Sequence, residues 1–174
     1  MGVPAGSHVL RFTSNHDNNL YDDTPIGLFG GETGSLGAFV ITSYMGGIPL
    51  IYTAQEIGYA TKIPFFSKSS INWAAGNMAM NAEYKKLIDF RKNSAAIKRG
   101  SIAYYTNNPD VVAFKRTSGT EEVVVLVNVR GRSITYTLDP ALSGTVWINA
   151  LTNTGVNLSS EIQLSPYSYL ILKK

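Results

Sequence analysis

The spacing of hydrophobic positions changes once along the chain, near residue 100. Before this point, residues 35–47 and 81–93 carry apolar side chains at helical intervals, with polar side chains mostly on the opposite face of the second segment. After it, apolar and polar residues alternate with a period of two in short runs separated by turn residues. The chain is therefore predicted to contain a helical part followed by a β-rich part.

The first part is predicted to alternate strands and helices. Residues 8–14 form a mostly apolar strand, and residues 18–34 a loop rich in Gly and Asp. Ser35 is the expected N-cap of the following helix, which ends at Gly46-Gly47. Residues 48–54 are apolar on both faces, which is typical of a buried parallel strand. Two such strands need neighbours, so we expect this part to be the end of a larger parallel barrel or sheet.

Six short runs rich in β-forming residues follow, which favours an antiparallel sandwich. The runs are SIAYYT, VVAFKRT, EVVVLVNV, SITYTL, TVWINAL and SYLILKK. Trp147 alternates with apolar neighbours in one of them and is expected in the core. The predicted organisation is thus residues 1–96 for the α/β part and residues 97–174 for the all-β part.

Composition excludes several classes of function. The 174 residues carry a net charge of +3 without a basic stripe, which argues against a nucleic-acid partner. The apolar runs are too short to cross a membrane, for which about 20 residues are needed. With no cysteine, disulfides, thiolate catalysis and cysteine zinc sites are excluded. Two histidines without ligand spacing argue against a metal site.

Two motifs and a linker resemble the α-amylase family of glycoside hydrolases. FTSNHD is similar to the motif on the seventh barrel strand of that family, and GGIPLIYTAQEIGY to the motif on the eighth. LIDFRKNSAAIKRGS is similar to the helix and linker that join the barrel to a C-terminal β-sandwich. The resemblance covers essentially the whole chain and points to bacterial enzymes that act on starch-type α-glucans. It implies the last two βα units of a (β/α)8 TIM barrel, followed by an antiparallel β-sandwich.

The resemblance also implies roles for individual residues. Asp17 matches the aspartate that stabilises the transition state by holding two sugar hydroxyls, and His16 matches the histidine that binds the same hydroxyls. Asn15 is expected to orient this pair, while Asn18, Asn19 and Tyr21 are expected to line neighbouring sugar subsites.

Tyr52 near the end of the second strand, and Gln55 and Glu56 directly after it, are expected to close the pocket or brace the barrel. Trp73, in the long loop that follows, is a candidate for stacking on a sugar ring.

A retaining glycosidase needs a nucleophile and an acid about 5–5.5 Å apart. In this family they lie on the fourth and fifth strands, and nothing in this sequence matches those motifs. We therefore expect a C-terminal fragment that does not turn over alone and whose partners are an α-glucan and the N-terminal barrel portion. No cofactor is expected in this chain, since the calcium ligands of amylases mostly lie upstream.

The alternative to an enzyme tail is a non-catalytic carbohydrate-binding or structural sandwich module. In isolation, the segment of residues 1–95 would expose apolar strand edges. We therefore also expect this segment to self-associate.

Overall fold

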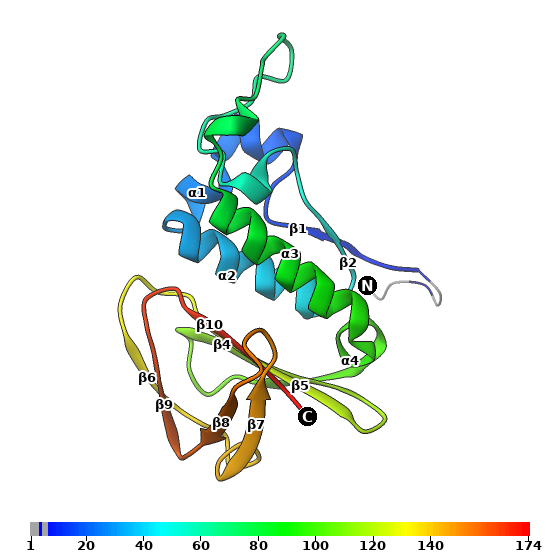
Figure 1. Cartoon of the computed structure of the whole chain (residues 1–174), viewed down its shortest axis with the longest axis vertical. Coiled ribbons are helices and arrows are strands. Elements are labelled where there is room, and N and C mark those ends of the chain that lie inside the picture. Colours follow the sequence, from blue (N-terminus) through cyan, green and yellow to red (C-terminus); the bar gives the residue numbers. More distant parts are fainter. Residues whose placement is uncertain (1–3, 5–6) are drawn as a thin grey trace. The chain divides into compact units, whose positions relative to one another are not determined.

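A computed structural model describes residue 4 and residues 7–174 of the chain (Figure 1). The chain divides into two compact units, Met1–Lys86 and Leu87–Lys174, here called unit 1 and unit 2. The division falls inside helix α3 (Met78–Asn93), whereas the boundary predicted from the sequence falls in the next helix, α4 (Ala95–Arg99).

Two short parallel strands joined through a helix form the frame of unit 1. Strand β1 (Leu10–Phe12) pairs with β2 (Ile48–Leu50), and α2 (Gly31–Tyr44) lies between them in the sequence. The other elements are a π-helical turn η1 (Asn18–Asp22), a short helix α1 (Pro25–Leu28), the 3-10 turns η2 (Gln55–Ile57) and η3 (Trp73–Ala75), and the first part of α3. The core includes Phe39 of α2 against Tyr84 of α3, with ring centroids 4.4 Å apart.

The helix starts in unit 1 differ from those predicted. Ser35 is not an N-cap but a buried residue inside α2, which begins after Gly30 with a φ of 80°. Only glycine adopts such a left-handed conformation readily, so the chain reverses there and the helix starts earlier. The predicted loop 18–34 is also wrong, since these residues hold η1, α1 and the first turn of α2. The predicted end of α2 before Gly46-Gly47 is confirmed.

Both strands of unit 1 are shorter and more exposed than predicted. Each has three paired residues, and Leu10 and Ile48 are 52% and 48% exposed. The reason is that, among the described residues, β1 and β2 pair only with each other. Apolar strand faces are therefore left uncovered in the described part of unit 1.

Unit 2 consists of the end of α3, the helix α4 and two antiparallel sheets. The larger sheet has the strand order β3-β4-β5-β10-β7-β8, and the smaller pairs β6 with β9. The strands are β3 (Ser101–Tyr105), β4 (Val111–Ser118), β5 (Glu121–Asn128), β6 (Ile134–Thr137), β7 (Thr145–Asn149), β8 (Gly155–Leu158), β9 (Glu161–Leu164) and β10 (Tyr169–Lys173). The predicted antiparallel character is confirmed, but β8 and β9, of four residues each, were not predicted.

Both sheets contribute to one hydrophobic core. Leu126 of β5 and Leu172 of β10 belong to the larger sheet, and Tyr136 and Leu164 to the smaller. Trp147 is 2% exposed within this cluster, which confirms its predicted place in the core. Burial of these side chains is the main stabilising contribution to unit 2.

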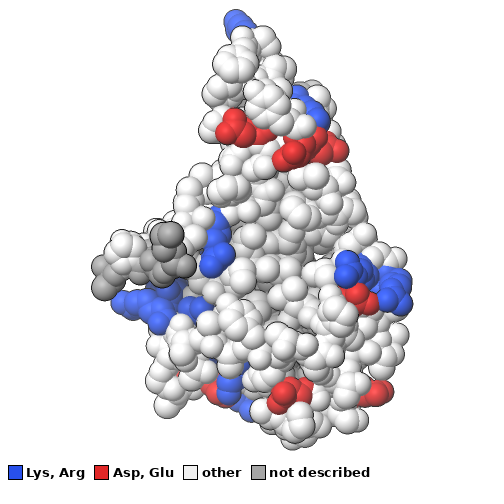
Figure 2. All heavy atoms as spheres, turned by 180° about the vertical axis from the view of Figure 1, so that it is seen from behind, with Lys and Arg blue, Asp and Glu red and all other residues white. Residues whose placement is uncertain are grey.

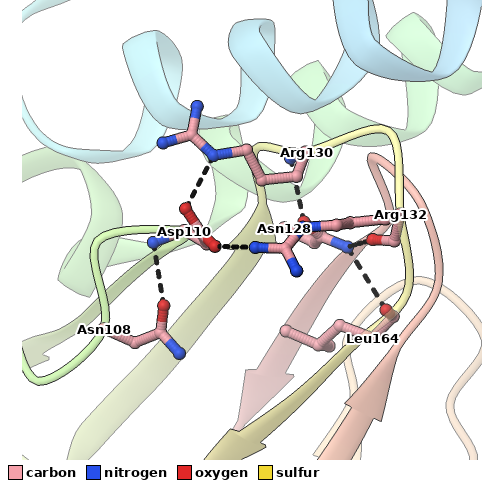
Figure 3. Close-up of polar contacts among 6 residues, drawn as sticks. All are labelled: Asn108, Asp110, Asn128, Arg130, Arg132 and Leu164. Atoms are coloured by element: carbon pink, nitrogen blue, oxygen red, sulfur yellow. Dashed lines mark hydrogen bonds and ion pairs between the residues drawn. The ribbon is translucent and has the colours of Figure 1, made fainter.

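A polar cluster holds the loop between β5 and β6 (Figure 3). The Asn128 amide is buried and donates to the backbone oxygens of Arg132 and Ser165, 2.8 Å in each case. The Asp110 carboxylate accepts from Arg130 Nε at 2.7 Å and from Arg132 Nη2 at 2.6 Å. The hydrogen bond from Arg130 holds the pKa of the Asp110 carboxyl below its usual value.

We expect Asp110→Asn to lower the melting temperature at about pH 7 and to have no effect once the pH lies well below the folded-state pKa of Asp110. Because the pKa of Asp110 is depressed in the folded state, its stabilisation is present above the unfolded pKa. The stabilisation is lost as the pH falls through the folded pKa. Circular dichroism melts of both proteins across this range measure the difference, with Asp139→Asn as the control. A melting-temperature difference that stays constant with pH would contradict the assignment.

Candidate substrate-binding site

The polar residues after β1 form a tight turn that emerges from the interior. Thr13 and Ser14 are buried, and the chain then reaches the surface at His16 and Asp17. The side-chain oxygen of Asn15 accepts from the backbone N–H of Asn18 at 2.9 Å, which fixes this turn. The π-helical turn η1 follows directly, and such turns are frequent at functional sites.

His16 and Asp17 present their side chains together. His16 Nε2 lies 3.5 Å from Asp17 Oδ1, and the two side chains are 50% and 66% exposed. An ionised carboxylate has about four acceptor positions, and an imidazole offers a donor and an acceptor. This pair is therefore able to hold adjacent hydroxyl groups of one ligand.

The three candidate residues in η1, Asn18, Asn19 and Tyr21, differ in exposure and in hydrogen-bond partners. Asn18 donates from its amide to Asp22 at 2.8 Å, and the Tyr21 side chain is 70% exposed. Asn19 is turned inward and is only 4% exposed. Its side-chain oxygen accepts from the backbone N–H of Ile63 at 2.7 Å. Asn19 thus anchors another loop rather than lining the surface.

Gln55 ties the ends of both strands together. Its amide nitrogen donates to Thr13 Oγ1 at 2.7 Å and to Tyr84 Oη at 3.0 Å, and its oxygen accepts from the Tyr52 N–H at 3.3 Å. Burial raises the pKa of the Tyr84 hydroxyl, with a smaller contribution in the same direction from the Glu56 carboxylate. Gln55 therefore braces the turn that carries His16 and Asp17, while Tyr52 and Glu56 are half-buried beside it.

Phe65 is a site residue that the sequence did not reveal. Its ring stacks on the His16 imidazole, with centroids 4.8 Å apart and an interplanar angle of 22°. It lies in the long loop after η2, which has no regular hydrophobic spacing. An aromatic residue in such a loop gives no sequence signal for the contact.

A pocket of about 440 Å³ opens next to this turn. Its lining is mostly apolar and consists of Phe12, Thr13, Asn18, Leu28, Phe29, Ala38, Ile41 and Thr42. His16 and Asp17 do not line it. The hollow is thus a surface between β1, α1 and α2, distinct from the exposed polar pair.

Residue 4 and residues 7–174 contain neither a cluster of metal-ligating side chains nor a membrane-spanning helix. No group of three or more His, Asp or Glu side chains there is arranged to hold a metal ion. Within the same residues, no helix has the length and apolar character needed to cross a membrane.

Comparison with known proteins gives consistent matches. Residues 103–171 match the family described as "Maltogenic Amylase, C-terminal domain". A cyclomaltodextrinase from Geobacillus thermopakistaniensis is 24% identical over 132 residues, covering 72% of this chain and 22% of that protein. An oligo-1,6-glucosidase from Bacillus cereus is 31% identical over 93 residues, covering 52% and 17%. The chain thus spans about a fifth of the length of these relatives.

Solved structures share the fold. The structure of AmyP in complex with maltose has a TM-score of 0.75 and 16% sequence identity, and it covers 98% of this chain and 41% of that chain. At this identity, the likeness concerns the fold alone.

Proposed function

We propose that this chain supplies one wall of an α-glucan-binding active site. The premise is that the chain belongs to the α-amylase family of glycoside hydrolases, as the C-terminal part of such an enzyme. His16 and Asp17 hold the sugar at the position where the glycosidic bond breaks. One observation carries the proposal. The exposed His16–Asp17 pair follows β1 and is joined, through the Thr13–Gln55 hydrogen bond, to the turn that follows the parallel strand β2.

The chemistry of the pair fits this role. The Asp17 carboxylate accepts hydrogen bonds from two neighbouring sugar hydroxyls, and its negative charge stabilises an oxocarbenium-like transition state. His16 binds the same hydroxyls, while Asn15 fixes the turn and Gln55 braces it from beneath. Asn18 and Tyr21 extend the binding surface along η1. Tyr52 and Glu56 flank Gln55 and close the pocket floor.

The wider architecture follows from the same premise. In the proposal, β1 with α2 and β2 with α3 are the last two βα units of a (β/α)8 barrel, and the sheets of unit 2 form the trailing sandwich. The exposed faces of β1 and β2 and the apolar hollow beside them are then covered by the preceding strands and helices of the barrel. The nucleophile and the acid come from those preceding strands.

The relatives support an α-glucan as the ligand. One curated relative is a cyclomaltodextrinase, and a structural neighbour was solved with maltose. By analogy, we take maltooligosaccharides and starch as substrates of the whole enzyme. No cofactor is proposed for this chain, and calcium in the whole enzyme stays a prediction.

The purified 174-residue chain is expected to release no reducing sugar from soluble starch, because the proposal places the nucleophile and the acid outside it. Reducing-sugar assays over a day, with the full-length protein as the positive control, measure this. Robust hydrolysis by the chain alone would contradict the proposal.

Electrophoresis of the chain through starch-containing gels distinguishes sugar binding at the His16–Asp17 pair from sugar binding elsewhere in the chain. Retardation that Asp17→Ala removes would support sugar binding at the His16–Asp17 pair. Retardation that Asp17→Ala leaves unchanged would instead favour a carbohydrate-binding module elsewhere in the chain.

A further inference from the structure

The loop between η2 and α3 is clamped at both of its ends. The Asn77 N–H donates to the Ile57 oxygen at 2.9 Å, which joins the two ends. A Cβ at Gly76 would lie 2.7 Å from the Cβ of Ile57, and one at Gly58 would lie 2.9 Å from the Met80 sulfur. Both glycines therefore permit close packing that a larger residue would disturb.

The middle of the same loop is fixed against the candidate site. The buried Asn19 side chain accepts from the Ile63 N–H, as described above, and two residues later Phe65 stacks on His16. Phe65 therefore lies against the imidazole of the exposed polar pair, and its ring, itself 51% exposed, constrains the plane of the His16 imidazole.

Phe66 continues outward from Phe65. The two rings meet edge to face, with centroids 4.8 Å apart and an interplanar angle of 84°. Phe66 is 85% exposed, although burial of an aromatic ring is normally favourable. The loop projects from unit 1 in Figure 1, and Figure 2 shows a mostly uncharged loop with a basic side chain at its tip and acidic residues at its base. The exposed Phe66 ring thus packs on Phe65, which in turn contacts the imidazole of the polar pair.

Building on the proposed function, we propose that Phe66 is a stacking platform for a second pyranose ring of the α-glucan, next to the ring held by His16 and Asp17. The apolar C–H face of a pyranose matches the electron-rich face of an aromatic ring. Ligand sites combine such apolar surfaces with a few polar groups that fix orientation. Phe65 supports Phe66 and positions His16, so the aromatic pair joins two neighbouring subsites.

The test uses the full-length protein that contains residues 1–174, with maltohexaose as the substrate. Phe66→Ala is expected to raise KM about tenfold, which corresponds to about 1.4 kcal/mol, while kcat changes less than about twofold. Phe66→Trp should keep KM near the wild-type value, because a stacking ring is retained. The matched control is Met78→Ala, which removes another exposed apolar side chain, 62% exposed, from unit 1 and should leave KM unchanged.

The possible outcomes separate this inference from the proposed function. An unchanged KM for Phe66→Ala, or a KM that Phe66→Trp fails to restore, would overturn the platform. A loss of kcat without a change in KM would also overturn it, since the role assigned to Phe66 is binding. If the proposed function is wrong, the Asp17→Asn variant would instead keep a normal kcat, independently of the results for the Phe66 variants.

Discussion

Asp17→Asn is expected to lower kcat of the full-length protein on starch by about 10²–10³-fold, with the melting temperature unchanged. The substitution keeps the shape of the side chain but removes the negative charge and one strong acceptor. In the folded chain the Asp17 side chain is exposed and contacts the exposed His16, so little folding energy depends on it. The loss therefore concerns interactions that strengthen in the transition state.

The matched control is Asp22→Asn, because Asp22 is also exposed and lies in the same segment. An asparagine there still accepts the hydrogen bond from the Asn18 amide. We expect its kcat to stay within about threefold of wild type, as for other surface substitutions. A near-normal rate for Asp17→Asn, or equal losses for the two variants, would refute the role of Asp17.

Arg116→Ala is expected to lower the free energy of unfolding of unit 2 by about 3 kcal/mol, a large share of the roughly 5–15 kcal/mol typical of a domain. The Arg116 side chain is 5% exposed in β4 and donates to the backbone oxygens of Ala96 and Ile97 at 3.2 and 3.1 Å. These oxygens belong to the short helix α4, where a cation is favourable near the C-terminal end. Burial lowers the pKa of the Arg116 guanidinium, yet the group stays charged.

Glu121 of β5, in the same sheet as Arg116, holds the N-terminal end of α4. The Glu121 carboxylate accepts from the N–H groups of Ala95 and Ala96 at 2.9 and 3.2 Å. Loss of Arg116 would therefore leave α4 attached at one end. The Ala96 oxygen would still accept from the Gly100 N–H at 2.9 Å, whereas the Ile97 oxygen would lose the Arg116 donor.

Urea unfolding in a Trp73→Phe background, followed by the fluorescence of the buried Trp147, measures the effect in unit 2. Arg99→Ala serves as the control, because Arg99 is exposed on the same helix. A change below about 0.5 kcal/mol for Arg116→Ala would show that α4 does not depend on these hydrogen bonds.

Some of the site could be predicted because its signal is local. The apolar run before Asn15-His16-Asp17 indicates a strand end, and the structure does place His16 and Asp17 at the surface after β1. The parallel pairing of the two strands also follows from their shared apolar character and the helix between them. The antiparallel sheets of unit 2 follow from a period of two and regular turns.

Other parts depend on contacts between residues far apart in the sequence. Gln55 is buried because Thr13 and Tyr84, which lie 42 and 29 residues away, supply its hydrogen-bond partners. Phe65 reaches His16 because Asn19 anchors the loop at Ile63. No local pattern encodes such contacts, so the sequence alone places neither Gln55 in the interior nor Phe65 at the site.

A crystal structure of the full-length protein with maltotriose bound would show whether Asp17 and His16 hold the sugar. We expect one sugar ring to lie against the turn after β1, with the Asp17 carboxylate and the His16 imidazole each within about 3.2 Å of its hydroxyl oxygens. A maltotriose bound in the active site with Asp17 and His16 both beyond hydrogen-bond distance of every sugar hydroxyl would contradict it.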